Sequence, residues 1–284
     1  MIRKSPLFRE QLAVLATLAL LTIAAWSLTL AQMQGMPGME DQGVAGSSGM
    51  GQGAMSGMPN MGGMPMDETS RPDPGVRLIM YLGMWTAMMA AMMLPAAAPM
   101  ILVFGTVYRT KRERGGTFVP TWVFVAGYLA VWVGFGTVAW AVGDLGEAIA
   151  RAYPMVGALG PRVAAAAMIA AGLYQLTPLK QRCLSHCRSP LSFLTHHWRP
   201  GTRGAWRMGI DHGVYCVGCC WVLFVLLVLV GLTSLPWMGL ITLIVCAEKL
   251  LPYGRPVTFG VAGLLVVLGI LTLTRPDLVA LTTG

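Results

Sequence analysis

The hydrophobic pattern divides the chain into long apolar runs separated by short polar connections. A helix needs ~20 mostly apolar residues to cross a hydrocarbon core of about 30 Å. Seven runs approach or exceed this length, and we predict membrane helices at residues 11–31, 78–107, 119–142, 156–177, 209–232, 236–251 and 257–273. The sixth run is short enough to be partly re-entrant. The expected fold is therefore all-α, a polytopic transmembrane helical bundle with a six-span core and one N-terminal span.

Lys and Arg between these runs predict the orientation, because short cytoplasmic loops carry the excess of positive charge. With the N-terminus inside, 15 of the 20 Lys and Arg residues fall on the cytoplasmic side. The opposite orientation inverts this ratio. We therefore expect the N-terminus inside and the C-terminus outside.

Four regions follow from these predictions. Residues 1–31 form an N-terminal membrane helix or signal anchor, because the apolar run exceeds the about 7 to 15 residues of a cleaved signal peptide. Residues 32–77 are an extracytoplasmic Met/Gly-rich segment without helical or strand periodicity, which we expect to be disordered. Residues 78–273 are the six-span membrane domain with a cytoplasmic loop at 178–208, and residues 274–284 are a short tail.

Composition agrees with a membrane protein, since 55% of the residues are hydrophobic and only 11% are charged. The net charge of +8 lies in short clusters between apolar runs, where it serves orientation, and we expect no nucleic-acid partner. The chain has no Walker motif and no phosphorylatable Asp signature. Any transport would then be passive or ion-coupled, and an enzymatic activity is not indicated.

Methionine is concentrated in the segment at residues 36–66. Thioethers are soft, uncharged ligands that select Cu(I) and are not consumed as disulfides in an oxidising compartment. We predict accessory metal capture on its Gly-rich backbone, with Met55, Met58, Met61, Met64 and Met66 as ligands. The alternatives are a Met-rich linker and an oxidant trap.

The run at 78–107 has a second concentration of methionine. At 100° per residue, Met80, Met84, Met88 and Met92 form one stripe and Met89 with Met93 an adjacent one. We predict that Met84, Met88, Met89, Met92 and Met93 are metal ligands, the alternative being adaptable core packing. Pro95 and Pro99 then predict a kink or hinge in this helix.

Cysteine and histidine occur in three patterns near the predicted cytoplasmic side. In the loop at 178–208, Cys183, His186 and Cys187 are spaced i, i+3 and i+4, which places them on one face of a helical turn. The run at 209–232 opens with a stripe at i, i+4, i+7 and i+8, made of His212, Cys216, Cys219 and Cys220. The run at 236–251 ends with Cys246 and Glu248, a carboxylate at membrane depth whose partner would be Lys249, Arg255 or a bound cation.

The cysteines and histidines of these three patterns and Glu248 are predicted metal ligands, although small cysteines in membrane helices also serve as packing residues. Thioethers would lie outside and thiols inside, and thiolates bind Cu(I) more strongly than thioethers. The leading hypothesis is Cu(I) binding with transport or delivery, while zinc or another soft metal fits the same ligands. One alternative is a membrane thiol redox protein using Cys216, Cys219 and Cys220. Another is an accessory or assembly subunit of a membrane complex, whose Met stripe is an interface.

The stretches "WTAMMAAMMLPAAAPM", "QLTPLKQRCLSHCRSP", "GVYCVGCCW" and "EKLLPYG" occur in this order. With them, the chain resembles the bacterial family of predicted metal-binding integral membrane proteins, a domain of unknown function, over roughly residues 78–256. The resemblance implies a multi-pass protein of the bacterial inner (plasma) membrane that binds metal. In a looser way, Met84 and Met88 in "MWTAM" look like the Met motif of eukaryotic copper importers, which have three spans. Expected partners are the lipid bilayer, a metal ion, a periplasmic or cytoplasmic metallochaperone, and a second copy or a membrane complex.

Overall fold

The structure is a computed structural model that describes residues 16–17, 19–20, 22–27, 73–113, 115, 119–153, 155, 159–229, 235–252 and 254–274. The predicted Met-rich segment at 36–66, with Met55, Met58, Met61, Met64 and Met66, lies outside the described residues, as does the tail beyond residue 274. Most of the predicted first span also lies outside them.

The labelled elements are all α-helices, and no strand occurs among the described residues. In chain order they are α2 (Pro74–Glu113), α3 (Thr121–Ala152), α5 (Gly160–Gln175), α6 (Pro178–Arg188), α7 (Pro190–His197), α8 (Gly201–Leu229), α9 (Leu235–Leu250) and α10 (Gly254–Thr274). The prediction of an all-α fold is confirmed.

Among the described residues, four of the predicted spans have the length and hydropathy of a membrane crossing. They correspond to Gly75–Arg112 in α2, Thr121–Ala152 in α3, Gly201–Val228 in α8 and Gly254–Thr274 in α10. The predicted spans at 156–177 and 236–251 are helical as α5 and α9, but each helix has only 16 residues. At a rise of 1.5 Å per residue, such a helix is about 24 Å long, shorter than a hydrocarbon core of about 30 Å.

Proline explains why α5 and α9 are short. Pro161 and Pro178 lie near the two ends of α5, and Pro236 and Pro252 near the two ends of α9. Proline is tolerated in the first turn of a helix but disfavours helical geometry in the residue before it. The apolar run at 156–177 therefore extends further than α5, whereas the run at 236–251 is as short as α9 itself.

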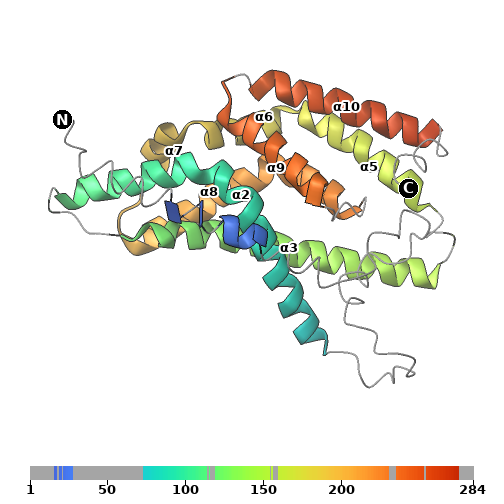
Figure 1. Ribbon diagram of the computed structural model, residues 1–284, viewed down its shortest axis with the longest axis horizontal. Coiled ribbons are helices and arrows are strands. Elements are labelled where there is room, and N and C mark those ends of the chain that lie inside the picture. Colours follow the sequence, from blue (N-terminus) through green and yellow to red (C-terminus); the bar gives the residue numbers. More distant parts are fainter. Residues whose placement is uncertain are drawn as a thin grey trace.

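Two helix pairs build the frame, which Figure 1 shows as two layers. In the first pair, α3 and α8 run parallel, and a Cβ atom on Gly209 would collide with the carbonyl oxygen of Phe124. In the second, α5 and α10 run antiparallel, and a Cβ atom on Gly269 would lie 2.6 Å from Cγ1 of Ile169. Glycine thus allows close approach of the backbones, as is common between membrane helices.

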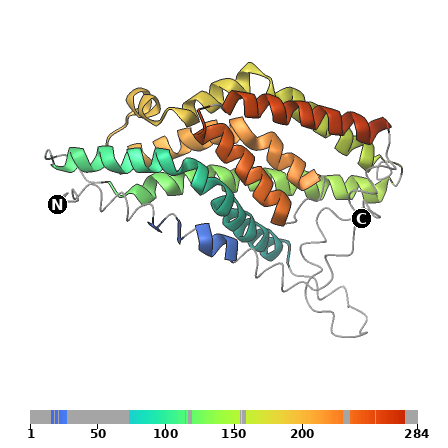
Figure 2. The same cartoon turned by 45° about the horizontal axis from the view of Figure 1, so that its top comes forward.

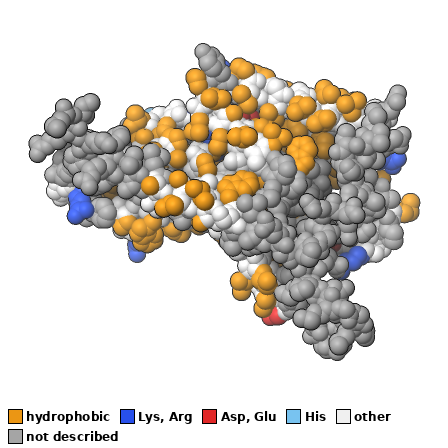
Figure 3. All heavy atoms as spheres, viewed as in Figure 1, with side chains coloured by type: hydrophobic (Ala, Val, Ile, Leu, Met, Phe, Trp, Pro, Cys, Tyr) orange, Lys and Arg blue, Asp and Glu red, His pale blue; other side chains and the backbone are white. Residues whose placement is uncertain are grey.

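Helix α9 lies between α2 and α10 in the second view (Figure 2) and contacts both. Helix α2 bends midway along its length (Figure 1), and Pro95 and Pro99 lie inside it, in agreement with the predicted kink. On the face shown in Figure 3, hydrophobic side chains cover much of the described surface, including α10, where Leu264 and Val267 are more than half exposed. This apolar exterior suits contact with lipid.

Candidate metal centre

Four cysteines are buried together where α6 meets α8. Cys216, Cys219 and Cys220 of α8 are at most 2% exposed, and Cys187 of α6 is 9% exposed. The Cys219 and Cys220 thiols donate to the carbonyl oxygen of Cys216, with sulfur-to-oxygen distances of 3.1 and 2.9 Å. Hydrogen bonds with Cys216 and Cys219, together with burial, hold the pKa of the Cys187 thiol well above its ordinary value. We call these four residues the cysteine cluster.

A lysine side chain closes the cysteine cluster from α9. The Lys249 ammonium is buried and donates to Cys216 Sγ, with a nitrogen-to-sulfur distance of 2.9 Å. The hydroxyl of Tyr128 on α3 lies 3.1 Å from the same sulfur. A buried ammonium requires a partner that compensates its charge, and a thiolate provides one. Three helices thus converge on Cys216.

The remaining two cysteines lie at the edge of this cluster. Cys183, one turn before Cys187, packs against Gly218, where an added Cβ would lie 2.8 Å from Cys183 Sγ. Burial and the nearby Cys219 raise the pKa of the Cys183 thiol. Cys246 on α9 is half buried against the core. All six cysteines are free thiols.

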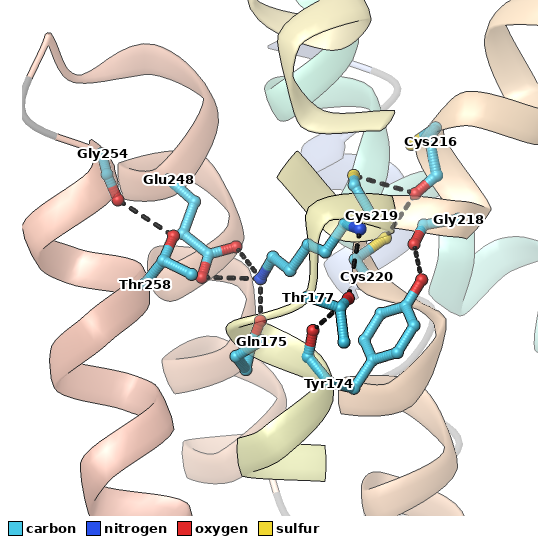
Figure 4. A network of polar contacts seen from close by, with 11 residues as sticks. Tyr174, Gln175, Thr177, Cys216, Gly218, Cys219, Cys220, Glu248, Gly254 and Thr258 are labelled. Atoms are coloured by element: carbon cyan, nitrogen blue, oxygen red, sulfur yellow. Dashed lines mark hydrogen bonds and ion pairs between the residues drawn. The ribbon is translucent and has the colours of Figure 1, made fainter. Parts of the chain in front are cut away.

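Glu248 forms an ion pair that the sequence analysis did not anticipate. Its carboxylate accepts from Lys180 of α6, whose Nζ lies 2.9 Å from Oε1 and 2.8 Å from Oε2. The same amine also donates to the side-chain carbonyl of Gln175, and Figure 4 shows the side chains of Gln175 and Glu248 close together. The partner is therefore Lys180, not the adjacent Lys249 or Arg255. Since neighbouring helical residues point about 100° apart, Glu248 and Lys249 serve different helices.

His212 lies one helical turn before Cys216, among aromatic rings. It is 2% exposed, and ring centroids of Phe124, Tyr128 and Phe193 lie 5.9, 5.7 and 5.4 Å from its own. Its Nδ1 atom has no hydrogen-bond partner among the described residues. A buried polar nitrogen without a partner is costly, which makes this imidazole a candidate ligand.

The methionines of α2 face the same hydrophobic core as the cysteine cluster. Met89, Met92, Met93 and Met100 are 0 to 2% exposed, Met84 and Met88 are half buried, and Met80 is 49% exposed. Burial therefore selects Met89, Met92 and Met93 over the predicted stripe that began at Met80. Whether any methionine is a ligand stays a prediction.

These side chains are gathered but not arranged as a metal cage. Within the described part of the chain, no three His, Cys, Asp or Glu side chains are positioned to share one metal ion. Hydrogen bonds explain why these side chains do not form a cage. Two thiols donate to a carbonyl oxygen, and the Lys249 ammonium donates to Cys216 Sγ. Thiolates nevertheless are the ligands that select Cu(I), and a pair of them suffices for it. The donor set fits copper once these hydrogen bonds exchange.

Sequence reasoning found the cysteine cluster and missed two residues that contact it. Lys249 had a signal, because it is an ionisable residue in an otherwise apolar run, although we considered it only as a partner of Glu248. Tyr128 had none, since a tyrosine in a membrane helix is common and its contact is 88 residues away in sequence.

A comparison with protein families gives one match. A family model described as "PpoB2: Copper chaperone" matches residues 82–272, about two thirds of the 284-residue chain. The matched range contains all six cysteines, His212 and Lys249. Searches of curated proteins and of solved structures gave no significant match. The family match relates the membrane domain to copper and agrees with the resemblance to a metal-binding membrane family. The chain belongs to the PpoB2 copper chaperone family.

Proposed function

We propose that this protein binds Cu(I) at the cysteine cluster within the membrane and delivers it to an acceptor. The observation that carries the proposal is the contact between the Lys249 ammonium and Cys216 Sγ, at 2.9 Å, inside a cluster of four buried cysteines. The Lys249 ammonium is a cation that already lies next to Cys216 Sγ, the soft ligand that would bind copper. If Lys249 gives up its proton to water as Cu(I) binds Cys216 Sγ, one positive charge replaces another, so the buried charge does not change when copper binds.

The arrangement of the helices supports the seven-span topology with the N-terminus inside. Because α3 and α8 run parallel, the chain must return between them, and α5 is the helix that makes this return. Basic ends also meet: Lys111 at the end of α2 lies 3.8 Å above the Trp198 ring, and Arg188 of α6 donates to the carbonyl oxygen of Leu251. A shared basic end is what the positive-inside rule places in the cytoplasm.

In this topology, the predicted series of sulfur ligands runs inward. The segment at 36–66 would collect copper outside, the buried methionines Met89, Met92 and Met93 would accept it, and the cysteine cluster would hold it at the cytoplasmic end. Thiolates bind Cu(I) more strongly than thioethers, which favours this direction. The plasma membrane of a bacterium is the proposed location.

Metal content of the purified full-length protein tests the proposal. After anaerobic Cu(I) loading against a chromogenic competitor, we expect bound copper with copper–sulfur distances in its X-ray absorption spectrum. The triple variant Cys216→Ser, Cys219→Ser and Cys220→Ser should lose this copper. Cys246→Ser is the matched control, because its thiol is half buried at the edge of the core, and it should keep the copper. Unchanged loading of the triple variant would contradict the proposal.

One observation favours the thiol redox alternative, and the same preparation tests it. Cys187 of α6 lies close enough to Cys216 and Cys219 of α8 for these two thiols to raise its pKa, and a disulfide between them would join the two helices. If the protein is a redox enzyme, Cys187 should be recovered in a disulfide-linked peptide after purification from membranes. If it is a copper protein, loading with Cu(I) should protect Cys187 from alkylation and no such peptide should form.

A further inference from the structure

A pair of histidines lies on the outer side of the cysteine cluster. His186 on α6 and His197 on α7 are half exposed, and their ring centroids are 6.1 Å apart at an interplanar angle of 78°. His186 directly precedes Cys187, and the tyrosine that contacts both rings, Tyr215, directly precedes Cys216. His186 is therefore one residue away from the cysteine cluster, and His197 approaches the cluster through Tyr215.

Both imidazoles present the same nitrogen outward. Nδ1 of His186 lies 2.9 Å from the carbonyl oxygen of Arg182, and Nδ1 of His197 lies 3.2 Å from that of Phe193. A carbonyl oxygen can only accept, so each Nδ1 carries the proton and each Nε2 of the neutral ring has a free lone pair. Metal-binding histidines usually show this arrangement, in which the second nitrogen donates to a carbonyl or carboxylate that fixes the ring.

Aromatic neighbours hold the two rings in place. His186 stacks on Tyr215 with centroids 4.2 Å apart and an interplanar angle of 3°, and His197 stacks on Phe193 at 4.5 Å and 10°. A metal lies about 2 Å from an imidazole nitrogen, so two rings that share one ion in a nearly linear arrangement have centroids about 6 Å apart. The separation of His186 and His197 agrees with this value.

Phe193 connects this pair to the interior. Its buried ring stacks on His197 on one side and lies 5.4 Å from the ring of His212 on another. His212 in turn lies one turn before Cys216. The Phe193 ring therefore separates His212, which is next to the cysteine cluster, from the two half-exposed imidazoles by the width of one side chain.

We propose that His186 and His197 form a second copper site, at which the ion leaves the cysteine cluster and is passed to an acceptor. The assignment of the exit role rests on the proposed function, whereas binding of copper by the pair does not. Imidazole is a weaker ligand for Cu(I) than thiolate, which suits a site of release. Two protein ligands also leave room for a ligand from the acceptor, so that the ion is exchanged without being released into solution.

His196 provides a matched control on the same helix. It is exposed, and its Nδ1 lies 2.8 Å from the carbonyl oxygen of Ser192, the same backbone contact as in His197, and 3.3 Å from Oγ1 of Thr195. Its ring, however, does not contact another histidine or an aromatic ring among the described residues. If any histidine affects copper binding, substitution at all three positions should lower it. If His186 and His197 form a site, only substitutions at these two positions should do so.

The first test is a footprint on the wild-type protein, which needs no variant. Full-length protein is titrated with Cu(I) and treated with diethyl pyrocarbonate, and modified peptides are quantified by mass spectrometry. We expect copper to protect His186 and His197 together, at least tenfold, and to leave His196 unprotected. Equal modification of all three histidines at full copper loading would overturn the proposal.

The second test is copper stoichiometry. His186→Gln and His197→Gln should each lose the weaker equivalent of copper, the double variant should lose no more than either, and His196→Gln should retain it. The triple cysteine variant separates the two proposals. If it loses the tight equivalent but copper still protects the histidine pair, both stand. If wild-type protein binds copper only through thiols, the histidine site is wrong and the proposed function survives. If copper protects the histidine pair but the triple cysteine variant keeps the tight equivalent, the histidine site survives and the proposed function is wrong.

Discussion

The buried ion pair between Lys180 and Glu248 predicts a large and pair-specific effect on stability. The two side chains are 0% and 2% exposed, and the ammonium contacts both carboxylate oxygens at 2.9 and 2.8 Å as well as Gln175. Lys180→Met removes the ammonium and leaves a carboxylate buried without a counter-charge. Breaking such a pair on one side typically costs about 3 to 5 kcal/mol. We expect Lys180→Met and Glu248→Leu each to lower the free energy of unfolding by about this amount.

The double variant should behave differently from the sum of the single ones. With both charges replaced by apolar side chains of similar volume, no uncompensated charge remains, and such replacements are often neutral or stabilising. We expect the Lys180→Met, Glu248→Leu protein to unfold within about 1 kcal/mol of wild type, so the coupling between the positions is several kcal/mol. Copper content equal to that of wild type would remove Glu248 from the predicted ligands and leave the pair with the role of holding α6 against α9.

The assay is reversible unfolding of the protein in mixed micelles by a denaturing detergent, followed by tryptophan fluorescence. An exposed pair provides the control: Arg199 and Asp211 are 3.7 Å apart with side chains 44% and 31% exposed. Asp211→Asn should cost less than about 1 kcal/mol, because exposed ion pairs contribute little. Single variants at Lys180 or Glu248 that cost no more than Asp211→Asn would refute the reasoning. So would a double variant whose loss equals the sum of the single losses.

Two further predictions concern the α3–α8 pair. Gly209→Ala places a Cβ against the carbonyl oxygen of Phe124 and should lower the free energy of unfolding by about 1 to 3 kcal/mol through overpacking. Gly134→Ala is the control, because nothing lies within 4 Å of its added Cβ, and it should be neutral or stabilise by up to about 1 kcal/mol. Equal shifts of the unfolding midpoint in the two variants would contradict the close approach of α3 and α8. Tyr128→Phe removes the hydroxyl that lies 3.1 Å from Cys216 Sγ and should cost about 1 kcal/mol while copper stoichiometry is retained, and loss of copper would instead make Tyr128 part of the ligand set.

Much of the site could be predicted because its spacing is local. His212, Cys216, Cys219 and Cys220 share one helical stripe by their intervals alone, and all four are buried on α8. The i, i+3 and i+4 spacing likewise indicated a helical turn within the predicted loop at 178–208, and the structure extends it to the 11-residue helix α6 that presents Cys187. Helical periodicity is a property of neighbouring residues and needs no tertiary information.

The contacts between helices could not be predicted in this way. Lys249 meets Cys216 across 33 residues, and Lys180 meets Glu248 across 68. Which face of a helix meets which neighbour depends on packing, and the apolar exterior of a membrane helix gives little contrast between its faces. The same reason explains why the predicted methionine stripe began at Met80, whereas the most buried methionines begin at Met89. The length of α5 was overestimated because hydropathy does not register where proline ends a helix, whereas the run predicted at 236–251 matches α9 to within one residue at each end.

Lys249 lies between the two buried networks, the Lys180–Glu248 ion pair and the cysteine cluster, and supplies the cluster with a positive charge. Glu248 anchors the end of α9 to Lys180 of α6, and this anchorage aims the adjacent Lys249 at Cys216 of α8. A cluster that carries its own counter-cation is compensated without copper, so under the proposed function copper would compete with the ammonium and bind less tightly than it would to bare thiolates. A permanent metal site would gain nothing from such competition. A protein that delivers its metal gains from the competition, because the Lys249 ammonium pairs with Cys216 again after the ion departs.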